Sequence, residues 1–216
     1  MCYRTKLNSK LQEIESSFEA VFIDPDSYIP KEEINGFAHH ETPVITDENP
    51  QEITLSKWGL IPFWAKSSEI QKSTLNAKIE TAQEKPSFQK AVNNRCLVIA
   101  DGYYEWQWLD AKGGTKQKYL LTTKEQSVFA FAGIYSYWKE PGTNYLHHTY
   151  SILTTEANEL MSRIHNNKRR MPVVLEKRDQ RKWLDGTDLS KFAFPYEVAL
   201  TATPVDEPGK QQALNF

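Results

Sequence analysis

Length, composition and charge predict one domain and exclude a simple nucleic-acid coat protein. The chain has 216 residues, 39% of them hydrophobic and 12% aromatic, which is enough apolar material for a single domain over residues 1–216. Its net charge of -2 argues against bulk electrostatic coating of nucleic acid, because proteins that bind in this way are strongly basic.

Hydropathy and cysteine usage indicate neither a membrane protein nor a secreted one. No run of about 18 apolar residues is present that could span a bilayer, and the opening MCYRTKLNSK lacks the apolar stretch of a secretory signal. We therefore expect a cytoplasmic protein in which both cysteines, Cys2 and Cys96, are free thiols.

The first half of the chain mixes helical and strand patterns. Apolar residues at helical spacing predict a short helix within Leu7–Phe18. Short strands are expected over 43–60, a surface loop over 67–74, and a helix over 86–94 that begins at a proline.

Strand patterns dominate the second half. Runs rich in aromatic and β-branched residues predict strands over 96–100, 102–109, 117–123 and 128–138, and a fifth strand begins near Tyr150. Turn residues separate these runs, so we expect consecutive strands to pair as antiparallel hairpins.

Further helices and a last strand complete the predicted order of elements. Helical patterns return over 154–164 and 176–184, and a strand is expected over 196–204. This order favours an α+β fold with a curved, barrel-like, mostly antiparallel β-sheet flanked by helices.

Cys2 is the residue with the most specific chemistry. Removal of the initiator methionine is generally permitted before a small residue, and it would leave an α-amine and a thiol on adjacent carbons. A terminal α-amine has a pKa of about 7.7 to 8.0, so part of it is nucleophilic at physiological pH. Such a 1,2-aminothiol condenses with an aldehyde to an imine and then to a thiazolidine ring. The alternative is an ordinary free thiol near a chain end.

Glu105 and His165 are candidates for proton transfer. Glu105 lies in the aromatic-rich run DGYYEWQWL, where desolvation disfavours the ionised carboxylate. Strand alternation places it with Tyr103 and Gln107 on one face, and a structural ion pair is an equal alternative. His165 precedes a basic cluster, where an imidazole could donate a proton near phosphates; a solvated loop histidine is the alternative.

Three further residues could bind DNA or position the substrate. Asn76 both donates and accepts hydrogen bonds, so it could fix the terminal amine or a sugar oxygen, or simply cap a turn. Trp58 and Trp64 bracket a proline-containing segment that could stack on bases or pack in the core.

A local excess of positive charge lies late in the chain. Between Arg163 and Lys182 there are eight basic residues and two acidic ones. This run could follow a phosphate backbone, or it could be a solvated helix face with many ion pairs. The histidines and cysteines lack metal-binding spacing such as CxxC or HExxH, so we expect no metal and no cofactor.

Four separated segments carry a more specific signal. They are MCYR at the start, WGLIPFWAK followed by NAKIET, CLVIADGYYEW, and IHNNKRRMPVVL. Together, and in this order, they resemble the SOS-response-associated peptidase (SRAP) family of abasic-site processing proteins over most of the chain. The resemblance implies Cys2 as nucleophile, Asn76 and Glu105 as active-site polar groups, and His165 as the acid that opens the sugar.

The same resemblance implies a set of DNA contacts. Its members are basic or aromatic residues: Arg4, Lys78, Arg170 and the segments around Trp58 and Trp106. Lys78 stands where the family commonly has arginine, so a bidentate phosphate contact becomes a point-charge contact. The residues NNKR between His165 and Arg170 also make this loop longer than is usual in the family.

These expectations combine into one hypothesis with two rivals. In the nucleoid, the protein would bind single-stranded DNA that contains an abasic site, and the sugar of that site would be opened to its aldehyde. The amine and then the sulfur of Cys2 would capture the aldehyde. The protein is expected to act as a monomer. A lyase side reaction is open at the imine stage, and the same Cys2 could remove Met1. The rivals are a peptidase acting on other proteins and a non-catalytic single-strand binder with salt-reversible binding.

Overall fold

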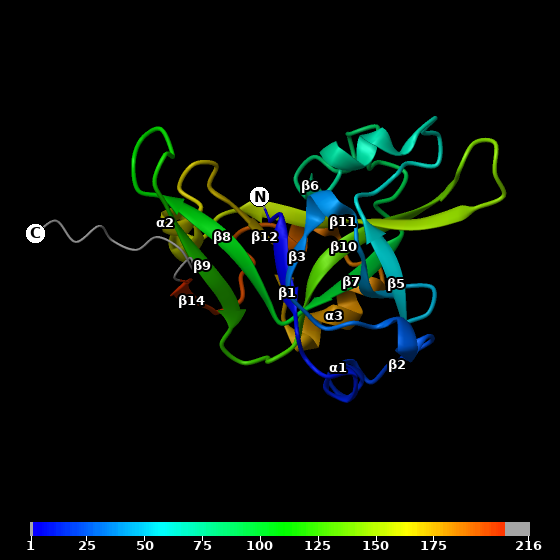
Figure 1. Cartoon of the computed structure of the whole chain (residues 1–216), viewed down its shortest axis with the longest axis horizontal. Helices are drawn as coiled ribbons and strands as arrows, with labels where there is room; N and C mark the ends of the chain where they lie inside the picture. The colour runs from blue at the N-terminus through cyan, green and yellow to red at the C-terminus, as the bar shows by residue number, and fades with distance from the viewer. Residues whose placement is uncertain (1, 206–216) are drawn as a thin grey trace, which may run out of the picture.

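Two curved sheets form the body of the molecule in the computed structural model, which describes residues 2–205 (Figure 1). The first sheet has the spatial order β14 (Leu200–Val205), β9 (Lys116–Thr123), β8 (Gly102–Trp108), β1 (Arg4–Leu7) and β3 (Lys31–Asn35). The second sheet has the main order β12 (Arg170–Pro172), β11 (Leu146–Glu156), β10 (Phe129–Lys139), β7 (Arg95–Ala100), β4 (Glu41–Thr46), β5 (Glu52–Trp58) and β2 (Val21–Phe22). Two short strands join it: β13 (Val174–Leu175) pairs with β10, and β6 (Asn76–Lys78) pairs with β11.

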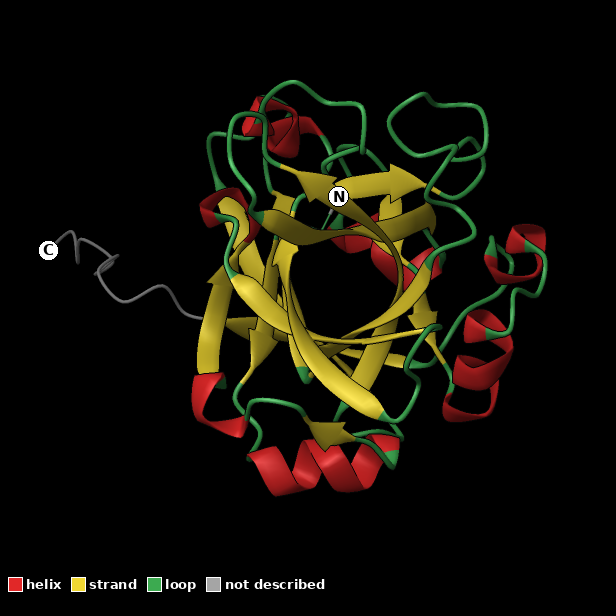
Figure 2. Ribbon diagram, turned by 90° about the vertical axis from the view of Figure 1, so that its right-hand side faces the viewer, coloured by secondary structure: helices red, strands yellow, loops and turns green. Residues whose placement is uncertain are grey.

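Helices are short and lie around the sheets (Figure 2). The α-helices are α1 (Leu11–Phe18), α2 (Glu159–Ile164) and α3 (Lys177–Leu184). The 3-10 helices are η1 (Pro25–Ser27), η2 (Gly36–Ala38), η3 (Ser68–Ser73) and η4 (Leu189–Phe192). No helix among residues 2–205 has the length and apolar character needed to cross a membrane.

The predicted α+β fold with a barrel-like sheet is confirmed. The strands curl around a common core (Figure 2), and their pairings are antiparallel except where β5 meets β2 and β11 and where β6 meets β11. Side chains from both sheets fill the interior: Tyr103 of β8 packs edge-on against Phe131 of β10 at 5.6 Å between ring centroids. The functional residues described below therefore stand on a rigid, fully packed support.

Close packing also explains why a glycine stands in the middle of β10. A Cβ atom at Gly133 would lie 2.7 Å from the Cys96 sulfur on the neighbouring strand β7. On the other side of β7, Trp183 of α3 is fully buried and its Nε1 donates a hydrogen bond to the Cys96 carbonyl at 3.0 Å. Cys96 is thus a packed core residue.

Two of the predicted hairpins are wrong. The turn at Asp101 carries the chain from β7 in the second sheet to β8 in the first, and residues 124–127 return it to β10 in the second. The carboxylate of Asp101 accepts hydrogen bonds from the backbone of Asn8 and Ser9, at 2.6 and 2.8 Å. A turn signal shows where a chain reverses, whereas the choice of partner strand depends on which sheet buries each face.

Several element boundaries also differ from prediction. The helix expected over 86–94 is a series of turns, and residues 196–199 precede the last strand rather than belonging to it. Strand β11 continues to Glu156, and α2 begins only after Asn158, whose side-chain oxygen accepts from Met161 N at 2.9 Å. Leu7 lies in β1 and not in the first helix, because it pairs with Lys31 of β3 at the end of a strand that lies between β3 and β8.

Candidate active site

Four predicted catalytic residues from four segments meet near the start of the chain. Cys2 directly precedes β1, Asn76 opens β6, Glu105 lies in β8 and His165 ends α2. Asn76 Nδ2 donates a hydrogen bond to the Cys2 carbonyl at 2.7 Å, and His165 Nε2 lies 4.0 Å from Glu105 Oε2. The structure therefore brings these residues together across both sheets.

Cys2 is completely buried. Its sulfur lies 3.9 Å from the Arg4 carbonyl. Burial raises the pKa of the thiol well above its usual range, and the charge of Glu105 raises this pKa further. The sulfur is consequently protonated at neutral pH in this state of the protein.

Asn76 fixes the main chain at Cys2. Its side chain is 9% exposed, and besides the bond to Cys2 its Oδ1 is buried with no hydrogen-bond partner among residues 2–205. A buried amide oxygen without a partner is unfavourable unless something donates to it. Asn76 thus offers an acceptor beside the predicted nucleophile, as expected for a group that orients an amine or a hydroxyl.

Glu105 points to the inner face of the first sheet, as strand alternation predicts. It is 4% exposed and shares this face with the fully buried Tyr103, whereas Trp106 lies on the other face near Arg4. Burial raises the pKa of the Glu105 carboxyl to about 7. Near neutral pH this group is therefore divided between its acid and base forms, which suits proton transfer.

His165 has the opposite shift. Burial lowers the pKa of its imidazole to about 4, so the ring is neutral at physiological pH. Its Nδ1 lies 2.8 Å from the Arg170 carbonyl and 3.2 Å from the Arg170 N–H, so this nitrogen meets both an acceptor and a donor of one residue, while Nε2 lies on the Glu105 side. Of the two groups, Glu105 is therefore the one that gains and loses a proton near neutral pH.

Arg4 and Trp106, both predicted DNA contacts, share the outer face of the first sheet. The Arg4 guanidinium carbon lies 6.0 Å from the centre of the Trp106 ring, and Lys118 Nζ lies 5.5 Å from it. Glu33 forms ion pairs with both Arg4 and Lys118. This face combines positive charge with an aromatic surface, but a carboxylate already neutralises part of the charge.

Trp58 is buried in the core and does not present the stacking surface for DNA that the family resemblance implies. It is 0% exposed, donates from Nε1 to the Leu75 carbonyl at 2.9 Å and stacks on Tyr150. It has no free surface on which a base could stack. The same segment exposes Phe63 and Trp64, at 63% and 48%, so stacking is available only from its second half.

Lys78 lies on β6 and Arg170 on β12, and each of these strands pairs with β11. Lys78 is exposed at the end of β6, where a phosphate could reach it. Arg170 instead forms a two-pronged ion pair with Glu80, at 2.9 and 2.7 Å, and also donates to the Thr154 carbonyl at 2.6 Å. Because its side chain is 14% exposed, Arg170 chiefly fastens β12 to Glu80 and Thr154. Its own main-chain carbonyl contacts His165.

The basic run of α3 forms ion pairs within its own helix and with its flanking residues. Arg178 pairs with Glu176 at 2.6 Å and Lys182 with Asp179 at 2.7 Å. Arg181 likewise lies 2.9 Å from an acidic residue one turn away. For the α3 part of the basic run between Arg163 and Lys182, the alternative of a solvated helix face with many ion pairs therefore describes the structure better than a phosphate track.

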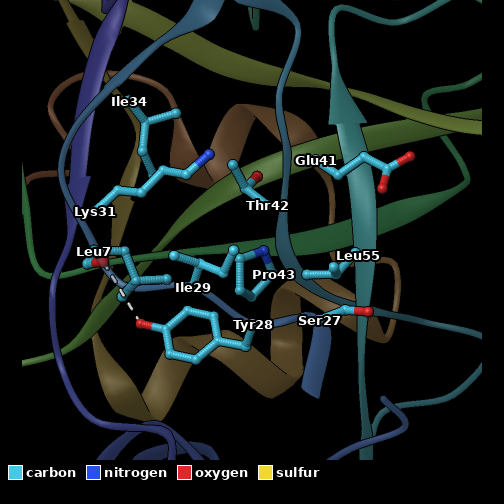
Figure 3. Close-up of a pocket in the computed structure, with 10 residues that line it drawn as sticks. All are labelled: Leu7, Ser27, Tyr28, Ile29, Lys31, Ile34, Glu41, Thr42, Pro43 and Leu55. Atoms are coloured by element: carbon cyan, nitrogen blue, oxygen red, sulfur yellow. Dashed lines mark hydrogen bonds between the residues drawn. The ribbon is translucent and has the colours of Figure 1, made fainter. Parts of the chain in front are cut away.

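A separate hollow lies beside β1, β3 and β4 (Figure 3). It has about 60 Å³ of free space, and Tyr28 donates to the Leu7 carbonyl at its floor at 3.5 Å. None of the predicted catalytic residues lines it. Its size suits a few waters rather than a nucleotide, because pockets for small molecules are several times larger.

Two residues that the sequence did not single out connect α2 and its loop to β8. Gln107 Nε2 donates to the Arg163 carbonyl at 3.1 Å. Asn166 makes two hydrogen bonds to the backbone of Trp108, at 3.0 and 2.9 Å. The position of Gln107 on the same strand face as Glu105 was the one signal available in advance. Among residues 2–205, no group of three potential metal-ligating side chains occurs.

The structure is thus that of an α+β protein in which the buried Cys2 is bound by Asn76, and Glu105 and His165 form a second buried pair. The chain belongs to the SOS response associated peptidase (SRAP) family, whose model matches residues 1–208. Met1 lies outside the described residues, so its removal stays a prediction.

Named relatives and a solved structure agree with this assignment. The chain is 39% identical over 205 residues to the abasic site processing protein YoqW of Bacillus subtilis, covering 92% of this chain and 88% of that protein. It is 30% identical over 200 residues to the abasic site processing protein HMCES of Mus musculus, covering 75% of this chain and 55% of that protein. A crystal structure of a Bacteroides thetaiotaomicron protein matches with a TM-score of 0.85 and 31% identity, covering 95% of this chain and 92% of that one.

Proposed function

We propose that this protein processes abasic sites by capturing them covalently in single-stranded DNA through Cys2, after loss of Met1. The observation that carries the proposal is the buried constellation of Cys2, Asn76, Glu105 and His165, with 2.7 Å between Asn76 Nδ2 and the Cys2 carbonyl. The names of the relatives, which are abasic site processing proteins, support the same substrate.

The proposed chemistry uses both nucleophiles of a terminal cysteine. The neutral α-amine adds to the C1′ aldehyde of the opened sugar, and loss of water gives an imine. The thiol then adds to the imine carbon, and its proton passes to nitrogen, which closes a thiazolidine. Because the raised pKa of the Cys2 thiol keeps sulfur protonated, the amine is expected to react first and the sulfur second.

Glu105 and His165 supply proton transfer in this scheme. With a pKa of about 7, the Glu105 carboxyl can protonate the leaving hydroxyl of the carbinolamine and then accept a proton again. The neutral His165 accepts or relays a proton through Nε2, which lies 4.0 Å from Glu105. The initial opening of the sugar by His165 alone is less favourable, because the pKa of its imidazole is lowered to about 4.

Single-stranded DNA is the proposed partner because the surface of the protein offers stacking and limited positive charge. Exposed Phe63 and Trp64 provide sequence-tolerant stacking, and Arg4 and Lys118 flank Trp106. An abasic sugar in a single strand reaches a recessed cysteine without the cost of opening a duplex. We expect the protein to meet this substrate in the nucleoid.

Trapping with a defined oligonucleotide tests the proposal. Protein whose mature terminus is verified by intact mass is mixed with a single-stranded oligonucleotide carrying one abasic site, and the products are separated under denaturing conditions. Wild type should give a stable adduct. Cys2→Ala retains the amine but not the sulfur, so it should give only an imine, trapped by borohydride or lost by β-elimination with strand cleavage. Wild type that leaves the lesion unmodified would refute the proposal.

Self-processing is a second candidate reaction, supported by the adjacent thiol, carboxyl and imidazole. In it the Cys2 sulfur attacks the carbonyl of the preceding residue, and the peptide C–N bond breaks as Glu105 and His165 pass the thiol proton to the nitrogen. Water then hydrolyses the resulting thioester, which releases Met1 and restores the thiol. Expression in cells without methionine aminopeptidase activity separates this reaction from ordinary processing: wild type should lose Met1, whereas Glu105→Gln should retain it. Cleavage of an unrelated peptide would instead favour a peptidase acting on other proteins.

A further inference from the structure

The loop after His165 is attached to β8 by a side-chain amide. Asn166 Oδ1 accepts a hydrogen bond from Trp108 N at 3.0 Å, and Asn166 Nδ2 donates to the Trp108 carbonyl at 2.9 Å. Both backbone polar groups of one strand residue are thus satisfied by one side chain. The amide takes the place that a neighbouring strand would occupy, and it does so at the last residue of β8.

A second contact joins the same two elements. Gln107 Nε2 donates to the Arg163 carbonyl near the end of α2 at 3.1 Å, and Gln107 Oε1 lies 3.3 Å from the Tyr119 hydroxyl on β9. Figure 1 shows α2 beside the ends of β8 and β9. The end of α2 and the following loop are therefore fastened to the strand that carries Glu105.

The rest of the loop is closed on itself. Arg169 N donates to the His165 carbonyl at 2.8 Å, and Arg169 adopts a left-handed conformation with φ of 49°. The Arg170 carbonyl then returns to His165 Nδ1 at 2.8 Å. One side of His165 is consequently held by its own loop, while the link to β8 on the other side runs through Asn166.

We propose that Asn166 is a positioning residue that sets the distance and orientation of the His165 imidazole relative to Glu105. The catalytic consequence rests on the proposed abasic-site capture, whereas the geometric consequence does not. Glu105 lies three residues before Trp108 on one strand, and His165 is the residue directly before Asn166. The two Asn166–Trp108 hydrogen bonds therefore connect the segment that carries Glu105 to the segment that carries His165, close to their 4.0 Å contact.

Charged groups around His165 come from three elements. Glu105 faces it from β8, Lys168 acts on it from its own loop, and Arg170 binds its Nδ1 through the main-chain carbonyl from β12. Without the two Asn166–Trp108 hydrogen bonds, the loop can move away from β8. Such a movement admits water to the His165 ring and weakens its contact with Glu105. Loss of a residue with only a general stabilising effect would change neither the hydration of the His165 ring nor its contact with Glu105.

The test compares Asn166→Ala with Asn167→Ala, a matched control at the next, exposed position, whose side chain makes no hydrogen bond within residues 2–205. Imidazole nitrogen and proton shifts of His165 are titrated by NMR in the free protein, without DNA. In wild type and Asn167→Ala, the ring should be neutral at pH 7 with a pKa of about 4. In Asn166→Ala, the pKa should rise toward the ordinary value of about 6.5 as the ring becomes hydrated.

Rates of adduct formation supply the second readout. Asn166→Ala should slow capture by up to about 100-fold and move its pH profile, since small displacements of catalytic groups have effects of this size. Asn166→Gln keeps the amide one methylene further out, should recover part of the rate, and replaces the alanine variant if that variant does not fold. A His165 titration and a rate unchanged from Asn167→Ala would overturn the proposal. If wild type forms no adduct, the proposed function fails, while the titration still decides the role of Asn166.

Discussion

The catalytic cluster and helix α3 are two polar regions with opposite properties. Within the cluster, Glu105 and His165 are two titratable groups, and both are buried. Desolvation raises the pKa of Glu105 and lowers that of His165. The basic residues of α3 are many, but Arg178 and Lys182 are 77% and 61% exposed and paired with acidic neighbours. The difference teaches that burial shifts the pKa of a single carboxyl or imidazole, whereas solvent and ion pairs neutralise a dense run of exposed charge.

The largest expected effect tests the same contrast on two tryptophans. Trp58→Ala should destabilise the protein by about 3–5 kcal/mol, because a fully buried ring and its hydrogen bond are lost. Trp64→Ala should leave the melting temperature nearly unchanged and weaken binding of single-stranded oligonucleotides, since its ring is 48% exposed. Thermal denaturation and fluorescence anisotropy measure the two effects. A stable Trp58→Ala that binds DNA poorly would mean that Trp58, not Trp64, contacts the bases.

The next effect concerns the pH dependence contributed by Glu105. With a folded-state pKa of about 7 against about 4.3 in an unfolded chain, the folded protein retains a proton that the unfolded chain has released. Stability should therefore fall as pH rises through this window, by at most about 4 kcal/mol. Glu105→Gln removes this dependence, and melting curves of both proteins across the window measure it.

His165 provides the internal check on that experiment. The pKa of its imidazole is lowered to about 4, so its contribution has the opposite sign: stability is lost as pH falls from about 6.5 toward 4. This loss should persist in Glu105→Gln and diminish in His165→Gln. Identical pH profiles for wild type and Glu105→Gln would show that the carboxyl is not desolvated in solution.

The smallest effect is expected on α3. Arg178→Ala and Lys182→Ala should change stability by no more than about 0.5 kcal/mol, as is usual for exposed ion pairs. Each should change the rate of abasic-site capture less than twofold. Adduct yield measured over a range of salt concentrations provides the control, because loss of phosphate contacts would reduce the salt dependence. A reduced slope would restore α3 as a DNA-binding surface.

Local patterns determined much of the fold. Runs of aromatic and β-branched residues identified β8, β9 and β10, and period-two alternation within β8 correctly separated Glu105 from Trp106 on opposite faces. Such patterns record which face of an element is buried. They could not show that the turn at Asp101 changes sheets, because pairing between β8 and β1 depends on residues about one hundred positions apart.

The residues themselves determined which chemistry is available, and the family motifs located Cys2, Asn76, Glu105 and His165. Only the tertiary structure decided that these four meet, that Trp58 is inaccessible, and that Asn166 fastens the histidine loop to β8. The physical reason is that a residue's type sets its possible bonds, whereas its pKa, exposure and partner depend on atoms contributed by distant parts of the chain.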